Sequence, residues 1–176
     1  GLRDAPRMRR QLALPAPLRI RVGINTGPVA IGAEASAQGL LFGADGEIVT
    51  AGRACTVQAL GGTGGLRVGA DFLRRFAPGA QVWISDPSLE NHRALFEAAG
   101  FTVNAYPYYH APTKGLDFDG MIGALSRAPE GHVVVLHACC HNPTGADIGR
   151  EDWARVIDTV RAAGLVPVLD MAYQGF

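Results

Sequence analysis

The stretch that decides the fold is HVVVLHACCHNPTGAD, residues His132–Asp147. It opens with the unbroken apolar run Val133–Leu136, which is typical of a strand buried on both faces of a parallel sheet. Two histidines, two cysteines, an asparagine and a proline turn follow directly behind that run. Polar side chains at the end of a buried strand indicate either a metal site or the mouth of a binding site.

The same rhythm extends in both directions from this stretch. Apolar strands alternate with amphipathic segments whose apolar residues recur at helical spacing. Such alternation predicts an α/β fold: a mostly parallel sheet with helices on both faces, from about residue 55 onward. Ligands of such sheets bind beyond the carboxyl ends of the strands. The expected strands are CTVQAL, QVWIS, FTVNAYPYY, HVVVLHAC and LVPVLD, at 55–60, 81–85, 101–109, 132–139 and 165–170.

The first forty residues follow a different pattern. Residues 18–32, LRIRVGINTGPVAIG, alternate apolar and polar residues around NTG, which predicts a short β-hairpin. We therefore expect an atypical N-terminal segment over 1–38, with the α/β unit over 39–176. Residues 18–32 also resemble the hairpin of class III adenylate and guanylate cyclases, although no metal-binding aspartates of the cyclase pattern precede them.

The balance of charged residues argues against nucleic acid and membranes as partners. The 176 residues carry 16 basic and 16 acidic side chains, so no net field favours nucleic acid or an anionic membrane. No apolar run reaches the length of a membrane span, and three cysteines do not form a regular disulfide framework. These features predict a cytoplasmic protein with small-molecule partners. The only lysine is Lys114.

Two strand ends carry groups suited to an anionic, cationic or proton-bearing ligand. GGTGG, Gly61–Gly65, lies before a helical segment, where backbone N–H groups and the Thr63 hydroxyl can hold a phosphate. The alternative is a glycine turn required only for close packing. Asp170 ends an apolar strand, so its carboxylate needs a cationic or proton-bearing partner, or else it caps the following turn.

A metal site is the weaker interpretation of the opening stretch. His137, Cys139 and His141 lie on one face of an extended chain, which permits coordination. The spacing lacks a second ligand pair of the zinc type. We therefore expect no metal there, but buried thiols flanked by hydrogen-bonded histidines.

From about Leu40 to Phe176 the chain resembles the aspartate and aromatic-amino-acid aminotransferases, which are pyridoxal-phosphate enzymes of fold type I. The resemblance implies a partial large domain of such an enzyme. It also implies transfer of an amino group between an amino acid and a 2-oxo acid, and a homodimer for the full-length protein. The matching stretches are LLFGAD, VQALGGTGGL, VWISDPSLENHRALFEAAGF, YPYYHAPTKGLDFDGMIGAL, CCHNPTGAD and LDMAYQGF.

The resemblance also implies roles for residues that bind the two ends of pyridoxal phosphate. Gly62 and Thr63 are expected to hold its phosphate. Asp170 is expected to bond the pyridine nitrogen and keep it protonated, which makes the ring an electron sink.

Further implied roles surround the cofactor ring. Asn142 and Tyr173 are expected to bond the 3-oxygen of the ring, with His92 and His137 in a supporting shell. Leu89 stands where the family stacks a tryptophan on the ring, so the stacking surface is poorer.

The family's lysine, which holds the cofactor as a Schiff base, belongs to a segment beyond AYQGF, where the sequence stops. We therefore expect the chain as given not to transaminate. Two alternatives stay open from the residues: a cyclase remnant, and a non-catalytic phosphate-binding module.

Overall fold

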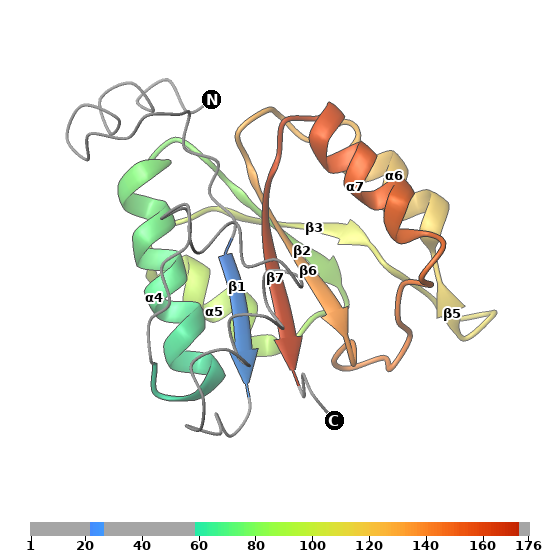
Figure 1. Ribbon diagram of the computed structural model, residues 1–176, viewed down its shortest axis with the longest axis horizontal. Coiled ribbons are helices and arrows are strands. Elements are labelled where there is room, and N and C mark those ends of the chain that lie inside the picture. Colours follow the sequence, from blue (N-terminus) through green and yellow to red (C-terminus); the bar gives the residue numbers. More distant parts are fainter. Residues whose placement is uncertain (1–21, 27–58, 173–176) are drawn as a thin grey trace, which may run out of the picture.

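The computed structural model describes residues 22–26 and 59–172 of the chain. Its main element is a five-stranded sheet in the order β1-β7-β6-β2-β3, with every neighbouring pair parallel. The carboxyl ends of β1, β7 and β6 point to the same edge of the sheet (Figure 1). The predicted parallel α/β architecture is thus confirmed. The strands are β1 Val22–Thr26, β2 Val82–Asp86, β3 Val103–Pro107, β6 Val133–Cys139 and β7 Val166–Ala172.

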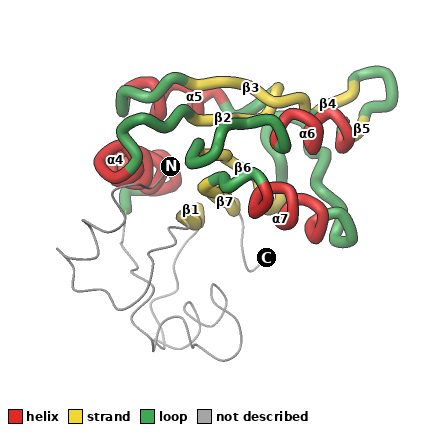
Figure 2. Tube along the Cα trace, turned by 90° about the horizontal axis from the view of Figure 1, so that it is seen from above, coloured by secondary structure: helices red, strands yellow, loops and turns green. Residues whose placement is uncertain are grey.

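Helices cover both faces of the sheet, as Figure 2 shows from above. Helices α4 (Gly61–Phe76) and α5 (Glu90–Ala98) pack on one face, and α6 (Phe118–Leu125) and α7 (Trp153–Ala162) pack on the other. Successive residues of β6 point to opposite faces: Val133 and Val135 belong to the α4–α5 core, whereas Val134 and Leu136 belong to the α6–α7 core. Burial on both faces explains the unbroken apolar run in this strand.

Local signals end and begin the helices where the sequence predicts them. Gly100 and Gly164 follow α5 and α7 with φ of +88° and +63°, a conformation that glycine adopts without a steric penalty. Asp117 caps α6, and its Oδ1 accepts a hydrogen bond from the Gly120 N–H at 3.1 Å.

A two-stranded antiparallel hairpin, β4 (Tyr109–His110) and β5 (Gly115–Leu116), follows β3. In Figure 1 it projects beyond α6, away from the edge where β1, β7 and β6 end. Lys114 lies in the turn of this hairpin, exposed and with a φ of 53°.

Two local expectations need correction. Val22–Thr26 does not stand apart from the α/β unit, because it joins the main sheet and pairs in parallel with β7. This pairing satisfies the backbone groups along the free edge of β7, which explains its preference over a detached hairpin. The rest of the predicted hairpin, 18–21 and 27–32, lies outside the described residues. The cyclase alternative rested on that hairpin alone, so most of the segment behind it is not described.

The second correction concerns the glycine run. Helix α4 begins at Gly61, so GGTGG forms its first turn rather than a loop ahead of it. The Gly64 N–H already donates a helical hydrogen bond to the Leu60 carbonyl at 3.2 Å. The strand expected over 55–60 falls mostly outside the described residues.

Candidate functional site

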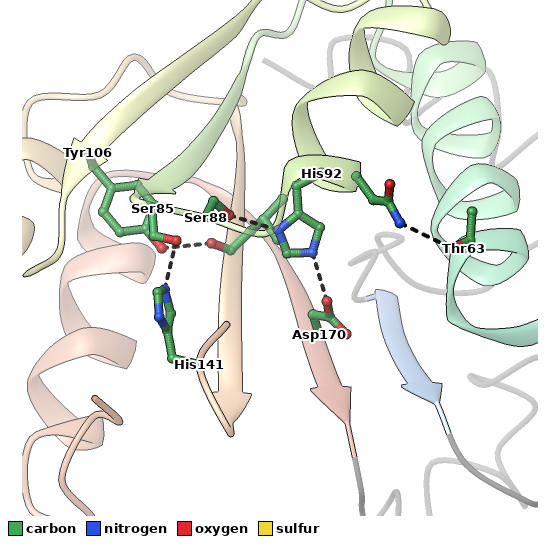
Figure 3. Close-up of polar contacts among 9 residues, drawn as sticks. Thr63, Ser85, Ser88, His92, Tyr106, His141 and Asp170 are labelled. Carbon is green, nitrogen blue, oxygen red and sulfur yellow. Dashed lines mark hydrogen bonds and ion pairs between the residues drawn. The ribbon is translucent and has the colours of Figure 1, made fainter. Parts of the chain in front are cut away.

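Asp170 lies at the carboxyl-terminal end of β7, directly opposite His137 of β6. The residue is 6% exposed, and its Oδ2 lies 2.7 Å from Nε2 of His92, which is fully buried. The expected proton-bearing partner of this carboxylate is therefore a histidine on α5. Figure 3 shows His92 reaching from α5 across the sheet edge to Asp170.

The imidazole of His92 is itself held in place from the other side. Ser88 Oγ lies 2.9 Å from its Nδ1. When the Nε2–H donates to the carboxylate, Nδ1 accepts from the Ser88 hydroxyl, so both ring nitrogens are used. Ser88 is not the cap of α5, since the N-cap is Leu89, with no side-chain cap bond. Ser88 instead orients the histidine.

The first turn of α5 also contacts the beginning of α4. Asn91 Nδ2 donates to Thr63 Oγ1 at 3.4 Å, and both side chains are exposed. Two consecutive residues of α5 thus contact the glycine-rich start of α4 and the carboxylate of Asp170. Asn91 was not predicted from the sequence, because an exposed asparagine in a helix carries no distinctive pattern.

A second polar group lies beside the first, around His141. Its Nε2 lies 2.9 Å from Ser85 Oγ, and its Nδ1 lies 2.8 Å from Thr144 Oγ1. The ring stacks on Tyr108 with centroids 3.8 Å apart. Burial lowers the pKa of His141 to about 4, so the ring is neutral at pH 7. The contacts of His141 with Ser85 and Tyr108 were not predicted from the sequence, because they join residues far apart in the chain.

The loop that carries His141 is fixed by Asp147. Its two carboxylate oxygens accept hydrogen bonds from the backbone N–H groups of Cys140 and His141, at 2.9 Å and 2.8 Å. An irregularity in the β6–β7 pairing between His137 and Cys139 precedes this turn. The loop behind β6 is therefore held by its own carboxylate.

His137 lies between the two groups and differs from both. It is 6% exposed, and within the described part of the chain neither of its ring nitrogens has a hydrogen-bond partner. Its ring centroid is 5.0 Å from that of His92 and 4.3 Å from that of His141. Burial, with smaller contributions from these two histidines, lowers its pKa to about 4. The expectation of hydrogen-bonded histidines is thus met by His141 and not by His137.

Comparison with known proteins identifies the family. The family model for aminotransferase class I and II matches residues 32–176. The chain belongs to this family. It is 58% identical over 139 residues to an aspartate aminotransferase of Pseudomonas aeruginosa, covering 79% of this chain and 35% of that protein. It is 50% identical over 137 residues to an aromatic-amino-acid aminotransferase of Escherichia coli K12, covering 78% and 34%.

Solved structures agree with this assignment. An aromatic-amino-acid aminotransferase from Burkholderia pseudomallei, covalently bound to pyridoxal phosphate, superposes with a TM-score of 0.77 at 52% identity, over 99% of this chain and 42% of that one. The cytoplasmic aspartate aminotransferase of Saccharomyces cerevisiae gives a TM-score of 0.77 at 35% identity, over 99% and 41%. This aminotransferase-family chain spans about a third of the length of the curated relatives that it matches.

The other predicted site residues of this aminotransferase-family chain are Gly62, Thr63, Leu89, Asn142 and Tyr173. Asn142 is exposed and directly follows buried His141. Leu89 is half-buried at the start of α5 and lines a hollow of about 350 Å³ together with Ser85. Tyr173 lies outside the described residues. Gly62 and Thr63 are in the first turn of α4.

Crossing a membrane requires a long, apolar helix. Across residues 22–26 and 59–172, none of them is both long and apolar enough to cross a membrane.

Proposed function

We propose that this chain is the pyridoxal-phosphate-binding part of an aminotransferase that passes an amino group between aspartate or an aromatic amino acid and a 2-oxo acid. The observation that carries the proposal is Asp170, a buried carboxylate at the carboxyl end of a parallel strand, held by His92 at 2.7 Å. Membership of the family supports the reaction class.

The chemistry of the residues fits the cofactor at its pyridine end. A carboxylate offers about four acceptor sites, and the bond to His92 occupies one of them. The remaining capacity suits a protonated ring nitrogen, because a carboxylate beside a cation forms a short, charge-assisted hydrogen bond. Asp170 would therefore keep the pyridine nitrogen protonated.

The phosphate end fits the beginning of α4. The first turn of a helix presents unpaired backbone N–H groups and a positive partial charge, both of which favour a phosphate. Gly62 and Thr63 lie in this turn, and Gly61 has a φ of +65°, a conformation that favours glycine. Asn91 joins Thr63 to α5. The same helix contacts Asp170 through His92, so α5 connects the phosphate end and the pyridine end of the site.

The remaining residues of the site would orient the carboxylate of Asp170 and contact the cofactor ring. When bound, the cofactor supplies an electron sink for the carbanion formed at the substrate α-carbon. Ser88 fixes the ring of His92, and His92 fixes the carboxylate of Asp170. The carboxylate is therefore already oriented before the cofactor binds. Leu89 offers an apolar surface to the ring, and Asn142 and Tyr173 are proposed to donate to its 3-oxygen.

The substrate class is proposed from similarity alone. The chain is 58% identical to an aspartate aminotransferase and 50% identical to an aromatic-amino-acid aminotransferase over nearly the same span. Both kinds of enzyme pair an amino acid with a 2-oxo acid.

A binding titration tests the proposal without requiring turnover. Pyridoxal phosphate is added to the chain and to Asp170→Asn, and binding is followed by absorbance and by quenching of tryptophan fluorescence. A lost charge-assisted hydrogen bond of about 1.5–3 kcal/mol predicts affinity weaker by roughly tenfold to a hundredfold in Asp170→Asn. Asp158→Asn, an exposed site on α7, serves as the matched control and should bind like the parent. Equal affinity of the parent and Asp170→Asn would overturn the assignment.

A further inference from the structure

We propose that His92, His137 and Asp170 form a binding site for a divalent transition-metal ion of the Zn²⁺ or Co²⁺ type, filled when pyridoxal phosphate is absent. Each residue offers one ligand atom, and these atoms lie within 4.8 Å of one another. The three residues are 0%, 6% and 6% exposed. They come from α5, β6 and β7, so the fold and not a local motif brings them together.

The sheet register places two of the ligands side by side. His137 and Asp170 are direct partners across β6 and β7, so their side chains leave the same face of the sheet. His92 approaches that face from α5 and already contacts Asp170. Metal–ligand bonds of about 2.0–2.2 Å place tetrahedral ligand atoms roughly 3.3 Å apart. Binding of an ion would therefore draw the three ligand atoms together from separations of up to 4.8 Å.

The unpaired ring of His137 points to a missing ligand. Within the described residues, both its nitrogens are buried without a hydrogen-bond partner. Burying such a group without a partner is costly, and coordination of one nitrogen by an ion removes part of that cost. Two neutral imidazoles and one carboxylate are also a common donor set of zinc sites that keep an open fourth position.

Ser88 supplies the second contact that a ligating histidine needs. Metal-bound histidines usually donate their other ring N–H to an oxygen atom, which fixes the tautomer. In the metal-free chain the Nε2–H of His92 faces Asp170. When an ion takes the Nε2 lone pair, the ring proton moves to Nδ1, where Ser88 Oγ accepts it. The exchange releases no proton, because the ring proton only moves from one nitrogen to the other.

The site has a consequence for cofactor binding that rests on the proposed function. Asp170 cannot coordinate an ion and receive the pyridine nitrogen at the same time. Metal ion and pyridoxal phosphate should therefore exclude each other. The N₂O donor set favours Zn²⁺, Co²⁺ or Ni²⁺ over Mg²⁺, which prefers oxygen ligands.

Cobalt is the probe, because Co²⁺ in a tetrahedral site absorbs visible light. The full 176-residue chain, freed of metal by a chelator, is titrated with Co²⁺. We expect one ion per chain, and an affinity lower by about 100-fold in His137→Leu. His110→Gln is the matched control, because His110 is exposed and bonds Thr113 in another part of the fold. It should bind Co²⁺ like the parent.

Thermal unfolding keeps the test valid if a variant folds poorly. Co²⁺ should raise the unfolding temperature of the parent and of His110→Gln, but not that of His137→Leu. Equal binding of Co²⁺ by His137→Leu and the parent would overturn the proposal. A strong thiolate-to-cobalt band in the near ultraviolet would also overturn it, since the ligands would then include one of the three cysteines, Cys55, Cys139 or Cys140.

Competition separates this inference from the proposed function. If Zn²⁺ lowers the affinity for pyridoxal phosphate in the parent and not in His137→Leu, both are supported. If Co²⁺ binds through His137 but does not affect pyridoxal phosphate, the metal site stands and the cofactor assignment of Asp170 fails. If no Co²⁺ binds while pyridoxal phosphate binding depends on Asp170, the metal site fails and the proposed function stands.

Discussion

Two buried histidines at the end of β6 have opposite hydrogen-bonding environments. His141 has hydroxyl oxygens at both ring nitrogens, Ser85 Oγ at 2.9 Å and Thr144 Oγ1 at 2.8 Å, and it stacks on Tyr108. His137 is as deeply buried, yet neither nitrogen has a partner within the described residues. The two rings are in contact, with centroids 4.3 Å apart.

The difference in hydrogen bonding distinguishes a histidine that stabilises the fold from one that is available to a ligand. A histidine whose bonding capacity is filled by the fold stabilises the fold and has nothing left for a ligand. A buried histidine with free nitrogens costs stability, and such costs concentrate at functional sites. On this argument the His141 side of the edge is structural. The side formed by His92, His137 and Asp170 is the binding side.

Lowering the pH should change the free energy of unfolding more than any substitution considered below. His137 and His141 have pKa values of about 4 in the folded chain, below the ordinary value near 6.5. The unfolded chain therefore binds protons first, so the free energy of unfolding is highest above pH 6.5 and falls as the pH drops toward 4. Each ring contributes a loss of about 3 kcal/mol by pH 4. The groups facing these rings are His92, Asp170 and Asp147.

Urea unfolding at a series of pH values measures this loss. His137→Leu should lose about half of the histidine-linked change, because one of the two rings is gone. A free energy of unfolding that stays level from pH 7 to pH 4.5 would contradict the account.

Removing the satisfied ring should have the next largest effect. His141→Leu deletes the bonds to Ser85 and Thr144 and the stack on Tyr108. Two hydrogen bonds of about 1 kcal/mol each and an aromatic contact of about 1 kcal/mol predict a loss near 3 kcal/mol in unfolding free energy. Chemical denaturation at pH 7.5 checks the value. A loss below about 0.5 kcal/mol would mean that these contacts are not structural.

Removing the unsatisfied ring should have a small effect of the opposite sign. His137→Leu replaces a buried group that has no hydrogen-bond partner among residues 22–26 and 59–172 by an apolar side chain. The free energy of unfolding should stay equal or rise by up to about 1 kcal/mol. The same denaturation experiment, run beside His141→Leu, gives the comparison directly. A loss above about 2 kcal/mol would show that His137 has a partner in solution.

The smallest effect should come from Lys114, the only lysine of the chain. It lies exposed in the turn between β4 and β5, outside both histidine groups. We expect no 2-oxo acid from this chain with several amino donors, and no change in pyridoxal phosphate affinity in Lys114→Ala. Stability should change by less than about 0.5 kcal/mol. Turnover that Lys114→Ala abolishes would contradict this assignment and make Lys114 the reacting amine.

Much of the fold follows from local sequence signals. The apolar run of β6, the helix-ending Gly100 and Gly164 and the cap at Asp117 act over a few residues, so the sequence predicts them. The pairing of Val22–Thr26 with β7 is not predicted, because alternation does not reveal whether a strand also pairs with a segment distant in sequence.

The site was predictable only in part. Asp170 is expected from a charge at the end of an apolar strand, and the family resemblance adds His92 and His137. The bonds of His92 to Ser88 and of Asn91 to Thr63 depend on the position of α5 over the sheet, which no local pattern specifies. The empty bonding capacity of His137 is likewise a property of packing.

The central claim is that Asp170 on the binding side receives the pyridine nitrogen of pyridoxal phosphate. Nitrogen NMR of pyridoxal phosphate labelled with ¹⁵N in the ring tests it directly, because the chemical shift of this nitrogen reports its protonation. Bound to the parent chain at pH 7.5, the nitrogen should be protonated, and bound to Asp170→Asn it should be unprotonated. The same unprotonated signal with both chains would contradict the claim.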